Sequence, residues 1–185
     1  RDRDFYEESG GGVTFSGGEP LVQLNFLLAA LEAARAQGLH TAVDTCGFAP
    51  GPDLLAVAER ADLFLYDLKL VDDERHRRYT GVSNVLILDN LRALALEHGN
   101  LWVRIPVIPG INDAAAAALD AAAFLAPLPG VREVHLLPYH RTGEPKFARL
   151  ERSYGLAGAE LLSPVHLARL AGIYADAGLV PKVLR

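Results

Sequence analysis

The chain has little from which a metal or disulfide centre could be built, because its 185 residues include a single cysteine, Cys46. One cysteine excludes an internal disulfide and any metal or cluster site made of several thiolates of this chain. Methionine is absent altogether, and the sequence begins at Arg1. We therefore expect that the natural protein has further residues in front of those given.

Long apolar runs and clusters of positive charge are also missing. No run approaches the roughly 18 apolar residues that span a bilayer, and the N-terminus has no apolar segment of the signal-peptide kind. We therefore expect a cytoplasmic protein with no membrane partner. The chain has 18 Lys and Arg against 23 Asp and Glu, for a formal net charge of −5. Because its basic residues are scattered, we expect no nucleic-acid partner.

What the sequence does contain is a β/α rhythm. Hydrophobic residues make up 50% of the chain, which is enough for one globular domain with a sizeable core. Short runs rich in Val, Leu and Phe alternate with longer segments of helical spacing, and this pattern predicts a parallel α/β fold. The expected strands cover residues 12–15, 40–44, 63–68, 102–108, 134–138 and, weakly, 180–184. The expected helices cover residues 21–37, 83–98, 113–126 and 164–177.

Polar residues or glycines follow five successive strands of this pattern. In a parallel β/α fold the loops after the strands gather at one face, and that face carries the chemistry. The five segments are SGGEP (16–20), DTCG (44–47), DLK (67–69), RIPVIPGIND (104–113) and PYH (138–140). Their convergence predicts a small-molecule site for an anionic or zwitterionic ligand.

Each segment also has a purely structural interpretation. The Gly-Gly-Glu-Pro turn either brings the backbone close to a ligand or turns a strand into a helix with Glu19 as its N-cap. Asp67 and Lys69 point to the same side of their strand, so they could pair with each other. Arg104, inside an apolar strand, needs a carboxylate or an anion. Cys46 is interpreted as a small buried residue.

The motifs GGVTFSGGEPL, DTCGF, DLKL, HRRYTGVSN, RIPVIPGIND and HLLPYHRTGEPKF occur in the order and approximate spacing found in the pyruvate formate-lyase activating enzymes. The resemblance covers nearly the whole chain and identifies it as a fragment of a glycyl-radical-enzyme activating enzyme, an oxidoreductase of the radical S-adenosylmethionine (SAM) type. It implies a partial parallel (β/α) barrel with about five of six β/α units present. Residues 1–185 would then form a single core domain that lacks the N-terminal cluster-binding part.

The resemblance also implies a chemistry. In this family a CxxxCxxC loop ahead of the first glycine motif holds a 4Fe-4S cluster, and SAM chelates its unique iron. Reductive cleavage of SAM leads to removal of a hydrogen atom from a glycine of the partner enzyme. The implied partners are a glycyl radical enzyme as protein substrate and flavodoxin or ferredoxin as electron donor. No CxxxCxxC precedes the glycine motif in this sequence, so we expect this chain to be inactive by itself.

Three sets of residues acquire roles from the resemblance, and none of them is catalytic. The SAM contacts would be Ser16, Gly17, Gly18, Glu19, Lys69, Arg104, Leu137 and His140. A monovalent cation beside the SAM carboxylate would be held by Asp44, Thr45, the carbonyl of Leu65, and Asp67. Residues 72–84 correspond to a loop that faces the glycine segment of the partner, with peptide contacts from Asp73, His76 and Arg77.

Two other functions stay open on the residues alone. The first is a cluster-free protein that binds SAM or a nucleotide without redox chemistry, which measurable SAM binding in the absence of iron would support. The second is a β/α-barrel lyase or aldolase that uses Lys69 as a Schiff-base amine. Borohydride trapping with carbonyl substrates that left Lys69 unmodified would count against it.

Overall fold

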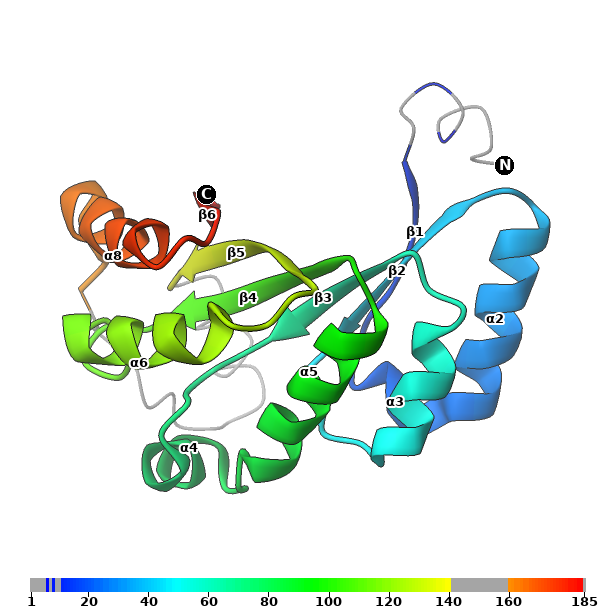
Figure 1. Cartoon of the computed structure of the whole chain (residues 1–185), viewed down its shortest axis with the longest axis horizontal. Coiled ribbons are helices and arrows are strands. Elements are labelled where there is room, and N and C mark those ends of the chain that lie inside the picture. Colours follow the sequence, from blue (N-terminus) through cyan, green and yellow to red (C-terminus); the bar gives the residue numbers. More distant parts are fainter. Residues whose placement is uncertain (1–5, 7, 9–10, 141–159, 185) are drawn as a thin grey trace, which may run out of the picture.

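One open, curved parallel sheet organises the molecule. The computed structural model describes residues 6, 8, 11–140 and 160–184. In this part the strands lie in sequential order, and every neighbouring pair is parallel (Figure 1). They are β1 (Gly12–Phe15), β2 (His40–Thr45), β3 (Leu63–Asp67), β4 (Leu101–Val107), β5 (Val131–Pro138) and β6 (Pro181–Val183). The sheet does not close on itself in the described residues, so the predicted partial barrel is confirmed.

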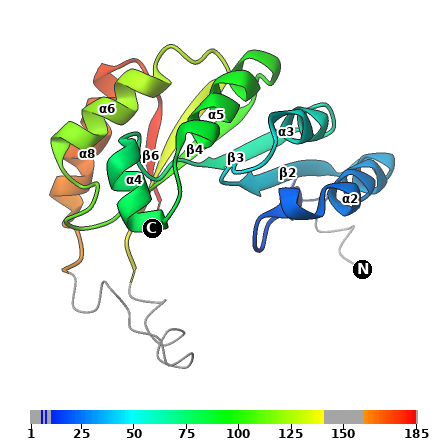
Figure 2. The ribbon, with the colours of Figure 1, turned by 90° about the horizontal axis from the view of Figure 1, so that it is seen from below.

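Helices cover the outer face of this sheet and leave the inner face open (Figure 2). They are the 3₁₀ turn η1 (Pro20–Gln23) and the α-helices α2 (Leu24–Ala36), α3 (Gly51–Ala58), α4 (Asp73–Thr80), α5 (Val85–Glu97), α6 (Ala115–Leu125) and α8 (Pro164–Asp176). The last helix begins as predicted, since the Ser163 side chain accepts the backbone N–H of His166 at 3.2 Å. None of the described helices is long and apolar enough to cross a membrane.

The alternation along β4 shows how the two faces of the sheet differ. Leu101, Val103, Ile105 and Val107 are buried beneath the helices, whereas the intervening side chains are only half-buried on the inner face. The register of the neighbouring strands places further polar residues beside Arg104 on this inner face. It aligns Asp67, Arg104, His135 and Lys182 in one row across four strands. The core therefore lies between sheet and helices, and the inner face carries polar groups.

Helices α3 and α4 were not predicted from the sequence. Both are short, and α4 also lacks an apolar stripe. Helix α4 lies within residues 72–84, which were predicted to form a loop, so that prediction is corrected for its eight helical residues. Asp72 caps it by accepting the N–H of Arg75 at 2.8 Å, and Gly81, at φ +83°, ends it. These capping residues were the only sequence feature that could have revealed the helix.

Candidate functional site

The centre of the site is a guanidinium group held between two carboxylates. Arg104 on β4 donates to Asp67 at the end of β3 through Nε at 2.9 Å and Nη2 at 2.7 Å. Its Nη2 also donates to Asp44 near the end of β2. The three side chains are only 19–24% exposed. Two carboxylates and one guanidinium leave this cluster with one net negative charge on the inner face of the sheet, which favours an approaching ammonium or metal cation.

The predicted cation site is brought together only in part. Asp44 and Asp67 lie close together, but Arg104 already pairs with both of them. The Thr45 hydroxyl turns away, donating to Glu19 at 2.7 Å and accepting the N–H of Gly47 at 2.9 Å. Among the described residues, no group of three His, Cys, Asp or Glu is placed to hold a metal ion. A monovalent cation would have to bind beside Arg104, which already uses Oδ1 of both Asp44 and Asp67, so this site stays a prediction.

The Gly-Gly-Glu turn is anchored to β2 by the side chain of Glu19. Its Oε1 accepts from the Thr45 hydroxyl at 2.7 Å and from the N–H of Leu21 at 3.3 Å. Its Oε2 accepts from the N–H and the thiol of Cys46, both at 3.0 Å. A carboxylate with four such donors is poorly placed to receive a ligand amino group as well. The turn would therefore offer its backbone carbonyls, with Glu19 holding them in position.

Ser16 joins the turn to the charged cluster. Its hydroxyl donates to Asp44 at 3.0 Å, so the turn and the cluster form one continuous rim. Both glycines of the turn are exposed at this rim, and Gly17 has a φ of +123°, which favours glycine. The structure thus gathers four of the five predicted segments around the ends of β1, β2, β3 and β4.

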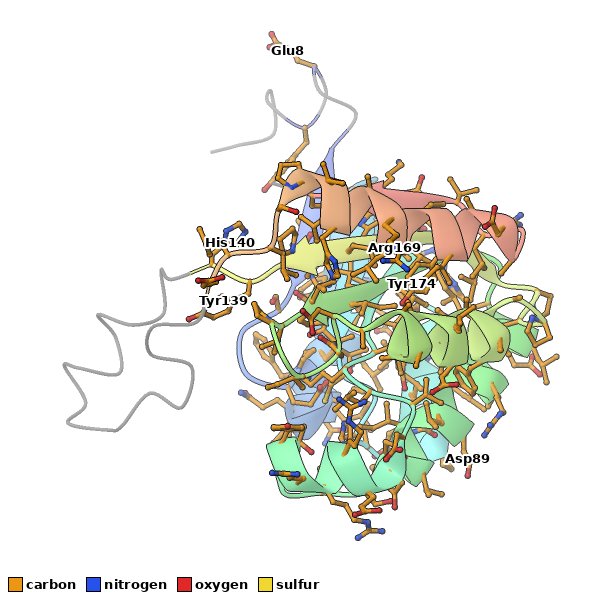
Figure 3. The ribbon with its side chains drawn as sticks, turned by 90° about the vertical axis from the view of Figure 1, so that its left-hand side faces the viewer. Glu8, Asp89, Tyr139, His140, Arg169 and Tyr174 are labelled. Carbon is orange, nitrogen blue, oxygen red and sulfur yellow. The ribbon has the colours of Figure 1, made fainter. Side chains whose placement is uncertain are left out.

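The remaining predicted contacts lie on the same rim. Lys69 is exposed just beyond β3, and Asp67 pairs with Arg104 and not with Lys69, so the alternative Asp–Lys pair is wrong. Leu137 is half-buried beside Pro106 in the register of β4 and β5. His140 follows the end of β5 and is exposed there (Figure 3). It borders a hollow of about 480 Å³ between β5, β6 and the start of α8.

The residues predicted to contact a partner peptide mainly hold their own segment in shape. Asp73 accepts from Ser83 at 2.6 Å, from the N–H of Asn84 at 2.9 Å and from Arg77 at 2.8 Å. His76 is only 3% exposed, and its Nδ1 lies 2.9 Å from the carbonyl of Val82. Direct contact between His76 and a partner does not fit a ring so deeply buried. Arg77, with 58% of its side chain exposed, is accessible to a partner peptide.

These contacts make the stability of this segment depend on pH. The hydrogen bonds from Ser83, Arg77 and Asn84 hold the pKa of Asp73 at about 2, below its ordinary 3.8. A depressed carboxyl pKa contributes stability above pH 3.8, and that contribution is lost as the pH falls toward 2. We expect Asp73→Asn to lower the unfolding temperature at neutral pH and the difference from wild type to shrink in acid. Thermal unfolding across pH measures this, with the exposed Glu74→Gln as control; an equal deficit at every pH would contradict it.

Three buried asparagines fix the loops of the rim, a role that the sequence interpretation assigned to none of them. Asn90, Asn84 and Asn112 are 4%, 1% and 9% exposed. Asn90 donates to carbonyls of the loop after β2, Asn84 to carbonyls after β3, and Asn112 to carbonyls beyond β3 and within β4, at 2.7–3.0 Å. An amide in an apolar helix, as in VLILDNLRALA around Asn90, is the pattern that could have revealed this role.

A second polar network lies on the inner face of β4, β5 and β6. Glu133 accepts from Lys182 at 2.7 Å and lies 2.6 Å from Nε2 of His135. Burial raises the pKa of Glu133, but the hydrogen bonds from Lys182 and His135 outweigh burial and lower it. The Trp102 ring packs beside both residues, 5.0 Å from the His135 ring and 5.7 Å from the Lys182 ammonium. This network joins β4, β5 and β6 beneath the rim.

The sequence was compared with protein families and with individual proteins. The model of the radical SAM superfamily matches residues 3–122. The trans-4-hydroxy-L-proline dehydratase activating enzyme of Clostridioides difficile is 44% identical, over 89% of this chain and 54% of the relative. The isethionate sulfite-lyase activating enzyme of Nitratidesulfovibrio vulgaris is 45% identical, over 95% of this chain and 57% of the relative. The chain thus spans about half the length of these curated relatives.

Solved structures show the same relationship. A crystal structure of a domain of pyruvate-formate lyase-activating enzyme from Bacteroides vulgatus superposes with a TM-score of 0.80 at 34% identity. The match covers 95% of this chain and 99% of that domain. The described residues therefore have the same fold as that crystallised domain.

Proposed function

The chain belongs to the radical SAM superfamily and, within it, to the activating enzymes of glycyl radical enzymes, and we propose that it supplies the SAM-binding part of such an activase. One observation carries this proposal. The Gly-Gly-Glu turn and the Asp44–Arg104–Asp67 cluster share one rim through the Ser16–Asp44 hydrogen bond at 3.0 Å. The rim therefore offers acceptors for an ammonium, and the exposed Lys69 just beyond β3 can attract a carboxylate, which together suits the zwitterionic end of SAM.

Each part of the rim has a proposed task toward SAM. The exposed backbone of residues 16–18 would accept hydrogen bonds from the amino group, while Glu19 keeps the turn in position. Lys69, which is exposed just beyond β3, would attract the carboxylate, while Arg104, paired with Asp44 and Asp67, would hold the cluster in position beside it. Leu137 would give an apolar wall, and His140 a polar contact for the nucleoside. When SAM is bound and reduced, it supplies the chemistry that removes a hydrogen atom from the substrate glycine.

The residues of this chain do not fit the 4Fe-4S cluster that the family uses. The chain has one cysteine, Cys46, and its thiol already donates a hydrogen bond to Glu19. A cluster with three cysteine ligands therefore cannot be held by this chain alone, and no step through it can be derived from these residues. We expect the chain by itself to be inactive.

The partners and the setting are part of the same proposal. The names of the relatives describe them as activating enzymes of other enzymes. We propose a glycyl radical enzyme as the protein substrate and flavodoxin or ferredoxin as the electron donor, in the cytoplasm. The assignment of residues 1–185 to one core domain also stays a prediction.

A test of the proposal uses the protein encoded by the whole gene, including any residues upstream of Arg1. After anaerobic reconstitution with iron and sulfide, the protein is reduced and mixed with SAM and with each glycyl radical enzyme encoded in the same genome. We expect an electron paramagnetic resonance signal of a glycyl radical that requires both SAM and reductant. SAM consumption without a radical on the partner, or a gene that encodes no cysteine triad, would refute the proposal.

A further inference from the structure

A hollow beside the rim lies between α4 and the loop that joins β4 to α6. Its volume is about 690 Å³, within the range of ordinary ligand pockets. Its walls are mainly apolar and include Tyr79, Pro106, Ile108 and Ile111. Lys69 stands at its edge, two residues beyond Asp67. The hollow is therefore continuous with the SAM-facing rim.

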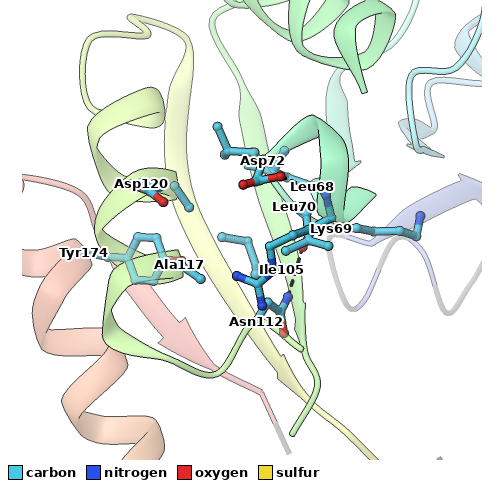
Figure 4. Close-up of a pocket in the computed structure, with 12 residues that line it drawn as sticks. Leu68, Lys69, Leu70, Asp72, Ile105, Asn112, Ala117, Asp120 and Tyr174 are labelled. Atoms are coloured by element: carbon cyan, nitrogen blue, oxygen red, sulfur yellow. Dashed lines mark hydrogen bonds between the residues drawn. The ribbon is translucent and has the colours of Figure 1, made fainter. Parts of the chain in front are cut away.

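The walls of this hollow are held in place by buried hydrogen bonds. Asn112, only 9% exposed, donates to the carbonyls of Lys69 and Pro106 at 3.0 and 2.7 Å and accepts the N–H of Ile108 at 2.7 Å. Arg75 on α4 donates to the carbonyl of Ile111 across the gap between the two elements. Figure 4 shows Lys69 directed away from Asp120 and Tyr174, which border an adjoining small cavity that shares Lys69, Leu70 and Asn112 with the hollow. The hollow is thus preformed, which lowers the cost of binding.

Two of the four polar side chains that line the hollow, those of Asn112 and Thr80, are already used in hydrogen bonds. The Asn112 amide makes the three bonds above, and the Thr80 hydroxyl donates to the carbonyl of His76 at 2.7 Å. An adenine ring would bring several nitrogen atoms that need hydrogen-bond partners, and these walls offer few. An aliphatic or aromatic side chain needs none. The chemistry of the walls therefore favours an apolar occupant over the nucleoside of SAM.

We propose that this hollow, the α4 pocket, receives a large apolar side chain that flanks the reacting glycine of the protein substrate. The inference rests on the proposed function. Glycine has no side chain by which an activase could select it, so selectivity must come from neighbouring residues. In an extended segment a neighbour lies only about 3.3 Å further along the chain. An occupant of the α4 pocket would thus set the glycine at the rim beside Lys69 and Asp67.

The test uses three seven-residue peptides with a central glycine, flanked on both sides by leucine in the first, by alanine in the second and by phenylalanine in the third. Binding of each peptide to the reconstituted protein encoded by the whole gene is measured by calorimetry in the presence of SAM, and SAM binding is measured in the absence of peptide. We expect wild type to bind the leucine peptide about tenfold more tightly than the alanine peptide. Ile111→Trp, which fills the pocket, should abolish this preference and leave SAM affinity within about twofold.

Two further variants keep the result decisive. Leu119→Trp on α6, where Leu119 is 57% exposed and outside the pocket, should keep the tenfold preference. Ile111→Ala, which enlarges the pocket, should move the preference from leucine toward phenylalanine even if the tryptophan variant fails to fold.

The outcomes separate the pocket from the proposed function. The pocket assignment is overturned if wild type binds SAM but shows no leucine preference, or if Ile111→Trp keeps that preference. It is also overturned if Ile111→Trp weakens SAM binding strongly, because the hollow would then hold the cofactor. Failure of wild type to bind either SAM or peptide counts against the proposed function itself.

Discussion

Replacement of Arg104 by methionine is expected to lower the free energy of unfolding by about 2 kcal/mol and to weaken SAM binding by about tenfold. Methionine keeps much of the volume but leaves Asp44 and Asp67 facing each other without a countercharge. The expected loss is smaller than the roughly 3–5 kcal/mol for a fully buried pair, since these side chains keep 19–24% of their surface exposed. Urea unfolding and calorimetry with SAM measure the two effects.

A matched control and a double variant test the physical reason. Arg92→Met on α5 removes an exposed Arg–Asp pair, with Arg92 51% exposed, and a contact with the Phe124 ring, and should change stability by less than Arg104→Met. Adding Asp67→Asn to Arg104→Met should recover part of the lost stability, because one of the unpaired carboxylates is then neutral. A double variant less stable than the single one would show that Asp67 has another stabilising partner.

Loss of the Glu19 carboxylate is expected to have the second large effect. Glu19→Ala should destabilise the chain by about 2 kcal/mol, because it removes a cap and leaves the Thr45 and Cys46 donors unpaired. SAM binding should weaken with it, since the glycine turn is no longer fixed to β2. Glu32→Ala on α2 is the control, because its carboxylate is 63% exposed and pairs only at the surface.

Glu19→Gln gives a chemical test of the same contact. Burial, then the hydrogen bond and charge of Glu19, raises the pKa of the Cys46 thiol above its ordinary 9.0. Removing the charge should lower that pKa and increase the thiolate fraction near pH 8. Alkylation of Cys46, the only cysteine, should therefore be faster in Glu19→Gln than in wild type. An unchanged rate would mean that Glu19 is not held against the thiol in solution.

The strands could be predicted well because buried parallel strands are short, continuous apolar runs. The expected strand over 12–15 coincides with β1, and that over 40–44 differs from β2 by one residue. The expected start of β5 was three residues late. Arg132 and Glu133 interrupt its apolar run, and the Glu133 side chain belongs to the polar network of the inner face.

The site was less predictable because its contacts join distant segments. The sequence placed Asp44 and Asp67 at strand ends and Arg104 inside a strand. It did not reveal the pairing of Arg104 with both acids, which depends on the stagger of β2, β3 and β4. The orientation of Glu19 toward Thr45 and Cys46 likewise results from how β1 and β2 lie together. Hydrophobic periodicity and secondary-structure propensity describe single segments of the chain, so they cannot reveal contacts between distant segments.

The position of Trp102 gives the molecule an intrinsic optical reporter. It is the only tryptophan of the chain, and it lies on the inner face of β4, two residues before Arg104, with its ring beside His135 and Lys182. Indole emission responds to nearby charge and to water. Selective excitation of this one fluorophore would therefore follow the filling of the barrel interior in real time, without a label and with no other indole contributing to the trace.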